Sequence, residues 1–151
     1  MNKFLIALAL LTLTLGSCKE EDFTIANDEE IKQYLADNNL TAEKTEEGLY
    51  YIITTEGTGA QPNIANEVTV HYKGYLLNGD IFDSSYDRGE QSTFKISRVI
   101  QGWQIGIPKL KEGGAGRLFI PSHLAYGNNP PNSRIPENAV LAFDIELFEV
   151  R

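Results

Sequence analysis

The fold is decided by the stretch Val68-Thr69-Val70-His71-Tyr72-Lys73, in which apolar and polar residues alternate. A period of two places successive side chains on opposite faces of a β-strand, so this pattern predicts a half-buried strand, which continues to Leu77. Asn78-Gly79 follows directly, and this dipeptide is typical of a tight hairpin turn. The centre of the chain is therefore predicted to be antiparallel sheet.

Working outward, further segments rich in aromatic and β-branched residues predict more strands. Val99, Ile100, Trp103, Ile107 and Leu110 recur at helical spacing, which predicts a short helix within 99–110 that Pro108 limits. About five antiparallel strands and one internal helix make an α+β arrangement. The other predicted strands are Leu49–Thr55, Thr93–Ile96, Arg117–Ile120 and Val140–Val150.

A second, shorter helix is predicted ahead of the sheet, in residues 27–47. Asn27 is expected to cap it, with Glu30 three residues later, and Asn38-Asn39 ends the run. Residues 41–48 are polar and predict a connector. A helix this short is expected to pack on its own domain, which favours a monomer; dimerisation through the helix is the alternative.

The first eighteen residues have the parts of an export signal. Lys3 gives a basic start, an apolar segment follows, and Gly16-Ser17 lead to Cys18, the only cysteine. The apolar segment is shorter than the roughly 20 residues needed to span a bilayer. Leu15-Gly16-Ser17-Cys18 resembles the lipobox of bacterial lipoproteins, which implies that residues 1–17 are removed and that Cys18 is lipidated.

An acidic tether is predicted over residues 18–26, and its charged start resembles the surface-export signal of some gram-negative lipoproteins. The resemblance implies an exported protein of the cell envelope, on the outer membrane and facing either the periplasm or the surface. A cysteine that merely lies near an ordinary cleavage site is the alternative.

Charge excludes one class of partner. The formal net charge is −8, and it becomes −9 without residues 1–17, whose only charged side chain is Lys3. Such a surface repels nucleic acid, and it also repels anionic lipid, so membrane attachment is expected through the lipid alone. The two histidines, His71 and His123, have no second ligand at metal spacing, so neither a metal nor a cofactor is expected.

Ordered sequence blocks from about Gly48 to Val150 resemble the FKBP-type peptidyl-prolyl cis-trans isomerases. The resemblance implies a half-barrel, a bent antiparallel sheet wrapped around one short helix, in residues 48–151. The blocks are Val70-His71-Tyr72-Lys73-Gly74, Gly79, Phe82-Asp83-Ser84-Ser85, Val99-Ile100-Gln101-Gly102-Trp103, Ile120-Pro121, Leu124-Ala125-Tyr126-Gly127, Ile135-Pro136 and Leu141-Ala142-Phe143-Asp144-Ile145-Glu146-Leu147.

The same resemblance implies a pocket for substrate proline between helix and sheet, with Trp103 as its floor. A buried Asp83 and Tyr126 would be its catalytic polar members, and Arg88 would pair with Asp83. Ser92 stands where a second aromatic wall residue is common, which predicts a more open side. The remaining substrate-binding residues implied are Tyr72, Phe82, Val99, Ile100, Ile135 and Phe143.

Rotation about an X-Pro bond needs no nucleophile, proton transfer or cofactor, which agrees with the absence of such motifs. The expected partners are proline-containing polypeptides, and the pocket is also compatible with macrolide ligands. Two functions stay open at this stage. The first is an active isomerase for exported proteins; the second is a binding module or holdase chaperone that uses the same pocket to hold envelope proteins.

Overall fold

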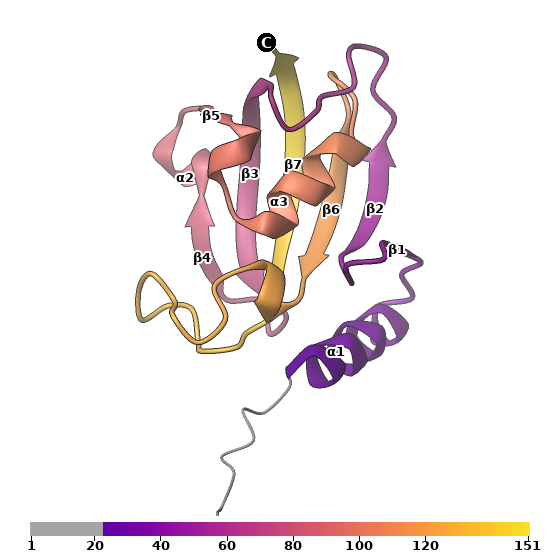
Figure 1. Ribbon diagram of the computed structural model, residues 1–151, viewed down its shortest axis with the longest axis vertical. Coiled ribbons are helices and arrows are strands. Elements are labelled where there is room, and N and C mark those ends of the chain that lie inside the picture. The colour runs from indigo at the N-terminus through magenta and orange to yellow at the C-terminus, as the bar shows by residue number, and fades with distance from the viewer. Residues whose placement is uncertain (1–22) are drawn as a thin grey trace, which may run out of the picture.

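A bent antiparallel sheet organises the molecule, and a computed structural model describes it over residues 23–151. The sheet has seven strands in the order β1-β2-β6-β7-β3-β4, with β5 paired to the far end of β3 (Figure 1). All strand pairs are antiparallel. The strands are β1 (Glu43–Lys44), β2 (Tyr50–Thr55), β3 (Glu67–Leu76), β4 (Ile81–Ser84), β5 (Ser92–Lys95), β6 (Ala115–Ile120) and β7 (Leu141–Val150).

The predicted internal helix is present and lies across one face of the sheet (Figure 1). This helix, α3 (Gln101–Gly106), passes into a 3-10 turn at Ile107–Lys109. Proline lacks the N–H that a continuing α-helix needs, so the change of helix type falls where Pro108 was expected to limit it. A single-turn helix, α2 (Ser85–Arg88), follows β4 and ends at Gly89, whose φ of 71° is left-handed.

Two glycines let α3 lie unusually close to the sheet. A Cβ on Gly102 would come within 2.3 Å of Ile120 Cγ2, and one on Gly106 within 2.5 Å of Leu118 Cδ1. Ile120 and Leu118 belong to β6 and are buried, so neither can move aside. The helix therefore packs backbone to side chain on β6, and Trp103, on an adjacent face of the same helix, is also buried against the sheet, where its ring contacts Tyr72 and Phe143.

The sheet has a core on each face. The larger core fills the space between α3 and the sheet and contains Val68, Val70, Trp103, Leu118 and Phe143. The smaller core lies between the N-terminal helix α1 (Phe23–Asp37) and the opposite face. It is formed by Ile31, Leu35, Tyr50, Tyr75, Phe119, Val140 and Ala142.

The predicted N-terminal helix exists and packs on its own domain, but its predicted start was wrong. The helix begins at Phe23, so Asn27 lies inside it and is not its cap. Asn27, Ile31 and Leu35 are spaced by four, which places all three on the buried face. The predicted tether of residues 18–26 thus overlaps the helix at 23–26, while Cys18 and the predicted signal segment lie outside the described residues.

Two strands escaped prediction. β1 has only two residues, both exposed, and lies in the segment expected to be a polar connector. β4 forms the hairpin partner of β3 after the Asn78-Gly79 turn, in which Gly79 has a φ of 95°. Neither strand has an alternation long enough to recognise. The five predicted strands are all present, and no helix among residues 23–151 is long and apolar enough to cross a membrane.

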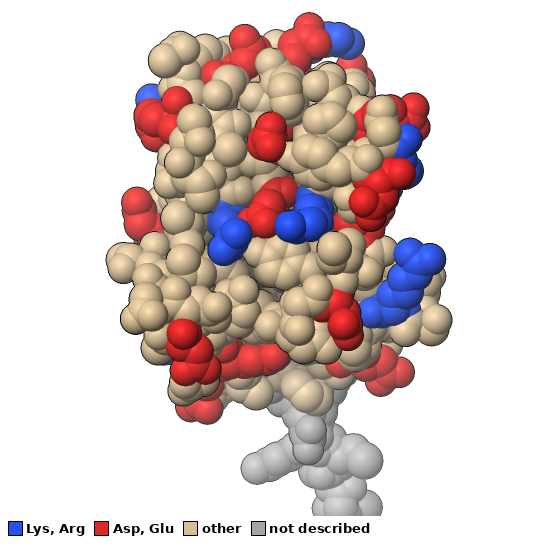
Figure 2. Space-filling model, turned by 180° about the vertical axis from the view of Figure 1, so that it is seen from behind, with Lys and Arg blue, Asp and Glu red and all other residues tan. Residues whose placement is uncertain are grey.

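The face of the sheet opposite α3 is marked by paired charges (Figure 2). Asp144 on β7 lies 2.5 Å from Arg117 Nε on β6 and 3.8 Å from Lys73 Nζ on β3. The Asp144 carboxylate raises the pKa of Arg117. These cross-strand pairs connect three neighbouring strands, and pairs of this kind contribute modestly to stability.

Because α3 packs so closely, Gly102→Ala is expected to destabilise the protein by about 1–2 kcal/mol. Overpacking against Ile120 costs roughly 1–3 kcal/mol, and the better helix propensity of alanine returns at most about 1 kcal/mol. Gln101→Ala, on the exposed first residue of the same helix, is the matched control and should be neutral within about 0.5 kcal/mol. Urea unfolding of both variants measures this; a neutral Gly102→Ala would mean that α3 can move off β6.

Candidate functional site

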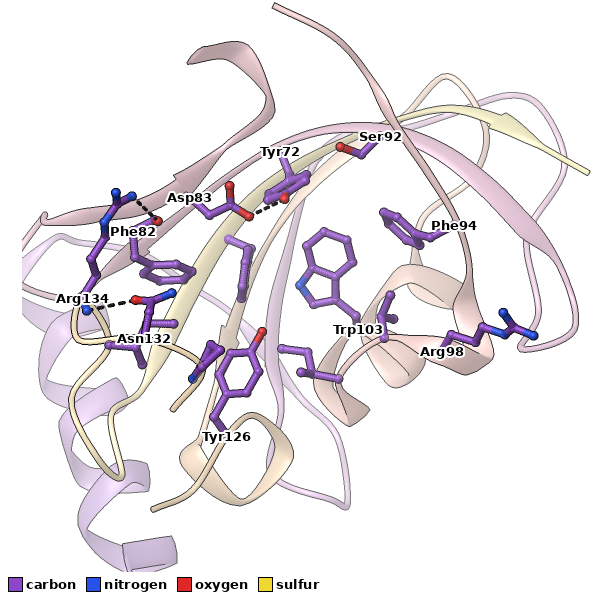
Figure 3. A pocket seen from close by; sticks show the side chains of 15 residues that line it. Tyr72, Phe82, Asp83, Ser92, Phe94, Arg98, Trp103, Tyr126, Asn132 and Arg134 are labelled. Carbon is purple, nitrogen blue, oxygen red and sulfur yellow. Dashed lines mark hydrogen bonds between the residues drawn. The ribbon is translucent and has the colours of Figure 1, made fainter. Parts of the chain in front are cut away.

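A cavity of about 810 Å³ lies between α3, the sheet and the loop that follows β6 (Figure 3). It gathers nine of the ten predicted catalytic and substrate-binding residues, which come from β3, β4, β7, the α3 region and that loop. The tenth, Arg88, does not line it. The cavity is lined by Tyr72, Phe82, Asp83, Ser92, Phe94, Arg98, Val99, Ile100, Trp103, Tyr126, Pro131, Asn132, Arg134, Ile135 and Phe143.

Trp103 stands at the centre of an aromatic cluster (Figure 3). Its ring centroid lies 5.1 Å from those of Tyr72, Phe94 and Phe143, and the contacts with Tyr72 and Phe143 are edge-to-face. Phe82 continues the cluster through Phe143, at 5.5 Å. Edge-to-face pairs are a favourable arrangement of aromatic rings, so these contacts stabilise the cluster. The indole nitrogen of Trp103 is buried and has no hydrogen-bond partner among the described residues.

Gly74 makes room for the wall of this cluster. A Cβ at Gly74 would lie 2.6 Å from Phe82 Cε2 and 2.7 Å from Phe143 Cε1. Both rings therefore rest directly on the backbone of β3. Gly74 was quoted in the sequence analysis only as part of a family block, and the structure gives the steric reason for a glycine at this position: a side chain would collide with Phe82 and Phe143.

The polar side of the cavity is a network around Asp83. One carboxylate oxygen accepts a hydrogen bond from the Tyr72 hydroxyl, and the other accepts one from Arg88 Nη1. Arg88 also donates to Tyr72 Oη at 3.1 Å and to Ser92 Oγ at 3.2 Å. Asp83 was expected to be buried, and this was wrong: its side chain is 43% exposed, because it sits at the rim where β4 ends. Arg88 holds Asp83 from outside the cavity.

Tyr126 faces this network from the loop on the other side of the cavity (Figure 3). Its ring is half-buried, and its hydroxyl has no hydrogen-bond partner among the described residues. Burial, with the nearby charge of Asp83 as a smaller cause, raises the pKa of Tyr126. The hydroxyl therefore keeps its proton at neutral pH and above, and it is a donor that points into the cavity (Figure 3).

The sequence missed five lining residues. Phe94 could have been found, because alternation along β5 places it on the same face as Ser92, and it packs on Trp103 beside the position where a wall residue was lacking. Ser92, the position at which the sequence predicted a more open side, is not one of the five; it also lines the cavity and accepts a hydrogen bond from Arg88. Of the other four missed residues, one ends a single 3-10 turn and three lie in the loop after β6, and neither segment gives a periodic signal. These four residues are Arg98, Pro131, Asn132 and Arg134.

The cavity contains neither a nucleophile with an adjacent base nor a metal cluster. No group of three or more His, Cys, Asp or Glu side chains that could hold a metal occurs within residues 23–151. The two histidines make structural contacts: His71 Nδ1 lies 2.8 Å from Ser85 Oγ, and His123 Nε2 lies 3.0 Å from the Glu47 carbonyl. What the site offers is an aromatic surface around Trp103, bordered by polar side chains, with the Tyr126 hydroxyl as a donor that has no partner among the described residues.

These features define a class of protein, and comparison with known families gives the same result. The sequence description of the FKBP-type peptidyl-prolyl cis-trans isomerase domain matches residues 59–148. The chain belongs to this family. The matched segment contains all the residues that line the cavity and excludes α1.

Individual relatives are similar over most of the chain. The FKBP-type isomerase FkpA of Aeromonas hydrophila is 42% identical over 138 residues, or 90% of this chain and 51% of that protein. FkpA of Buchnera aphidicola from Schizaphis graminum is 50% identical, over 72% of this chain and 43% of that protein. The crystal structure of Escherichia coli FkpA is 37% identical with a TM-score of 0.75, covering 85% of this chain and 61% of that one. This chain spans about half the length of the curated relatives that it matches.

Since Trp103 is the only tryptophan, its fluorescence reports directly on the cavity. Phe94→Ala is expected to shift Trp103 emission to longer wavelength and to increase quenching by acrylamide, because the variant uncovers one side of the indole. The same variant should cost about 2 kcal/mol of stability, below the value for a fully buried phenylalanine. Phe148→Ala, 45% exposed on the opposite face of the sheet, is the control and should leave the spectrum unchanged. An unshifted Phe94→Ala spectrum would contradict the proposed lining.

Proposed function

We propose that this protein is an active peptidyl-prolyl cis-trans isomerase that binds proline-containing polypeptides in the aromatic cavity over Trp103. The observation that carries the proposal is the combination of an aromatic floor centred on Trp103 with the Tyr126 hydroxyl, a donor without a partner among the described residues, at its wall. Membership of the isomerase family supports it.

The physical basis is the electronic change during rotation. A planar X-Pro amide is stabilised by resonance and is strongly dipolar, and the barrier to rotation of about 18–20 kcal/mol comes from the loss of that resonance. The twisted transition state has less charge separation. An apolar pocket that excludes water therefore solvates the planar state poorly and the twisted state comparatively well, which lowers the barrier.

The two polar residues have distinct proposed roles. The Tyr126 hydroxyl donates a hydrogen bond to a substrate carbonyl and thereby fixes the substrate over Trp103. Asp83 acts on the substrate through its charge or through the Tyr72 ring, which it holds by a hydrogen bond. Burial, and next the hydrogen bond to Asp83, raise the pKa of Tyr72, so the Tyr72 proton stays in this bond at neutral pH.

The proposed ligands follow from the same cavity. Its volume of about 810 Å³ lies within the range of sites for drug-sized molecules, which supports binding of a proline with its neighbours and also of a macrolide. The packing of α1 on its own sheet, with Ile31 and Leu35 buried, supports a monomer over a dimer formed through that helix.

The isomerase is tested by proline-limited refolding of a standard substrate protein, which the wild type is expected to accelerate. Tyr126→Phe should lower kcat/KM about threefold, since it removes one neutral hydrogen bond. Asp83→Ala should lower it about tenfold, since it frees both Tyr72 and Arg88 from a charged acceptor. No acceleration by the wild type would reject the enzyme and leave a binding module.

The matched control is Asp83→Asn, which keeps an acceptor for Tyr72 and removes the charge. Near-normal activity of Asp83→Asn would assign Asp83 to holding Tyr72, whereas activity as low as in Asp83→Ala would assign its effect to charge. Equal activity of all variants would mean that the shape of the cavity carries the reaction without its polar groups.

We further propose that the protein is a lipoprotein of the cell envelope, anchored through Cys18. The lipobox-like Leu15-Gly16-Ser17-Cys18 after a short apolar segment supports this. The net negative charge also supports an anchor, because an acidic domain is not attracted to an anionic membrane and needs another means of attachment. Two or three acyl chains, at about 0.8 kcal/mol per buried methylene, anchor stably.

Cys18→Ser is expected to abolish incorporation of labelled fatty acid and to move the protein from the membrane fraction to the soluble fraction. Isomerase activity per mole should stay unchanged, because Cys18 lies outside the domain that forms the cavity. Labelling that persists in Cys18→Ser, or a wild type recovered unlabelled in the soluble fraction, would reject the anchor.

A further inference from the structure

Asn27 is the most unusual polar residue in α1. It is 3% exposed, and its neighbours on the same helix face, Ile31 and Leu35, are apolar. Its side-chain amide contacts residues about a hundred positions away. Oδ1 accepts a hydrogen bond from the backbone N–H of Ser122 at 2.8 Å, and Nδ2 donates to the backbone carbonyl of Asn138 at 3.2 Å.

Ser122 and Asn138 bracket the loop that forms one wall of the cavity. Within this loop, the N–H of Gly127 donates to the Ser122 carbonyl at 2.9 Å, and the N–H of Asn138 donates to the Gly127 carbonyl at 2.7 Å. The two ends of the loop thus meet at Gly127, and Asn27 binds both of them from outside. Five of the fifteen lining residues lie between them: Tyr126, Pro131, Asn132, Arg134 and Ile135.

The chemistry of the contact requires an amide. Ser122 presents a buried donor and Asn138 presents an acceptor, so the side chain between them must accept on one atom and donate on the other. An aspartate could satisfy only Ser122, and an apolar residue neither. A buried N–H without a partner is costly, so removal of the amide favours opening of the loop ends to water.

The Asn138 end of the loop also holds a rarely adopted backbone conformation. Its φ of 56° lies in the left-handed region, which asparagine tolerates better than most residues. Such a conformation persists when surrounding contacts fix it, and here these are the Gly127 carbonyl and the Asn27 amide.

We propose that Asn27 is a positioning residue, through which α1 fixes the wall loop 122–138 and hence the Tyr126 hydroxyl over the cavity. The inference rests on the proposed isomerase function for its catalytic consequence. It places part of the site's support outside the matched family segment, which begins at residue 59, because α1 ends at Asp37.

The test compares two substitutions on the same buried face of α1 in the full-length chain. Asn27→Ala removes the contact to the loop, whereas Leu35→Ala removes packing against the sheet from the same helix. Amide hydrogen exchange of Gly127 and Asn138 is measured along with kcat and KM for a proline peptide. Exchange at both amides should rise about tenfold in Asn27→Ala beyond any change in global stability, and kcat/KM should fall about threefold to tenfold.

Leu35→Ala should lower stability without either effect. Asn27→Asp is the second variant, should Asn27→Ala fail to fold. It keeps the acceptor for Ser122 and lacks the donor, so exchange should rise more at Asn138 than at Gly127. Equal loop protection in Asn27→Ala and Leu35→Ala, or unchanged protection in Asn27→Asp, would overturn the proposal.

The exchange readout separates this proposal from the proposed function. If the wild type proves inactive but Asn27→Ala still opens the loop, the isomerase assignment fails and the positioning role stands. If the wild type is active and Asn27→Ala loses activity without increased exchange, the positioning role fails and the isomerase assignment stands.

Discussion

The close contact between α3 and strand β6 is the constraint on which the cavity depends. Two glycines of the helix allow its backbone to rest on Ile120 and Leu118, and the neighbouring Trp103 is buried against Tyr72 and Phe143 of the same sheet. A helix only slightly further from the sheet would lift the indole out of its edge-to-face contacts with Tyr72 and Phe143. The missing side chains of Gly102 and Gly106 therefore set how closely α3 approaches the sheet, and the large Trp103 side chain forms the floor of the cavity.

The rest of the site consists of an aromatic part and a polar part, which are held in place in different ways. The sheet and α3 supply an aromatic surface fixed by packing. The polar groups are fixed by one another: both oxygens of Asp83 are engaged, and Arg88 binds Tyr72 and Ser92 as well. The Tyr126 hydroxyl has no hydrogen-bond partner among the described residues. This arrangement suits a reaction that breaks no covalent bond, since the aromatic surface can surround the proline while the Tyr126 hydroxyl orients the substrate.

Much of this could be predicted from the sequence, because periodic patterns are long in the parts that matter. The alternation from Val68 to Leu77 and the spacing from Val99 to Leu110 gave the central strand and the helix over it. Both signals reflect burial, which repeats along a strand or helix and so leaves a pattern. The nine residues that line the cavity were instead implied by the resemblance of ordered sequence blocks to the FKBP family.

Contacts that depend on one residue left no such pattern. Asn27 was interpreted as a helix cap, because asparagine before acidic residues is common at helix starts, and only the fold shows that it lies on a buried face. The resemblance placed Asp83 in an apolar pocket and so predicted its burial, but the sequence does not show that its side chain lies at the cavity rim near the end of β4. Arg98 ends a single 3-10 turn, and Asn132 and Arg134 lie in a loop, so no periodic pattern indicates that these residues line the cavity.

The early start of α1 has a geometric consequence for an anchored protein. Because Phe23 already lies in α1, at most residues 19–22 separate the helix from Cys18. Five residue steps, from Cys18 to Phe23, cannot exceed about 18 Å in any conformation, which is less than twice the width of one helix. A domain held by Cys18 would work in the thin layer of solvent next to the lipid headgroups, and it would meet polypeptides as they pass along the membrane and not those that diffuse far from it.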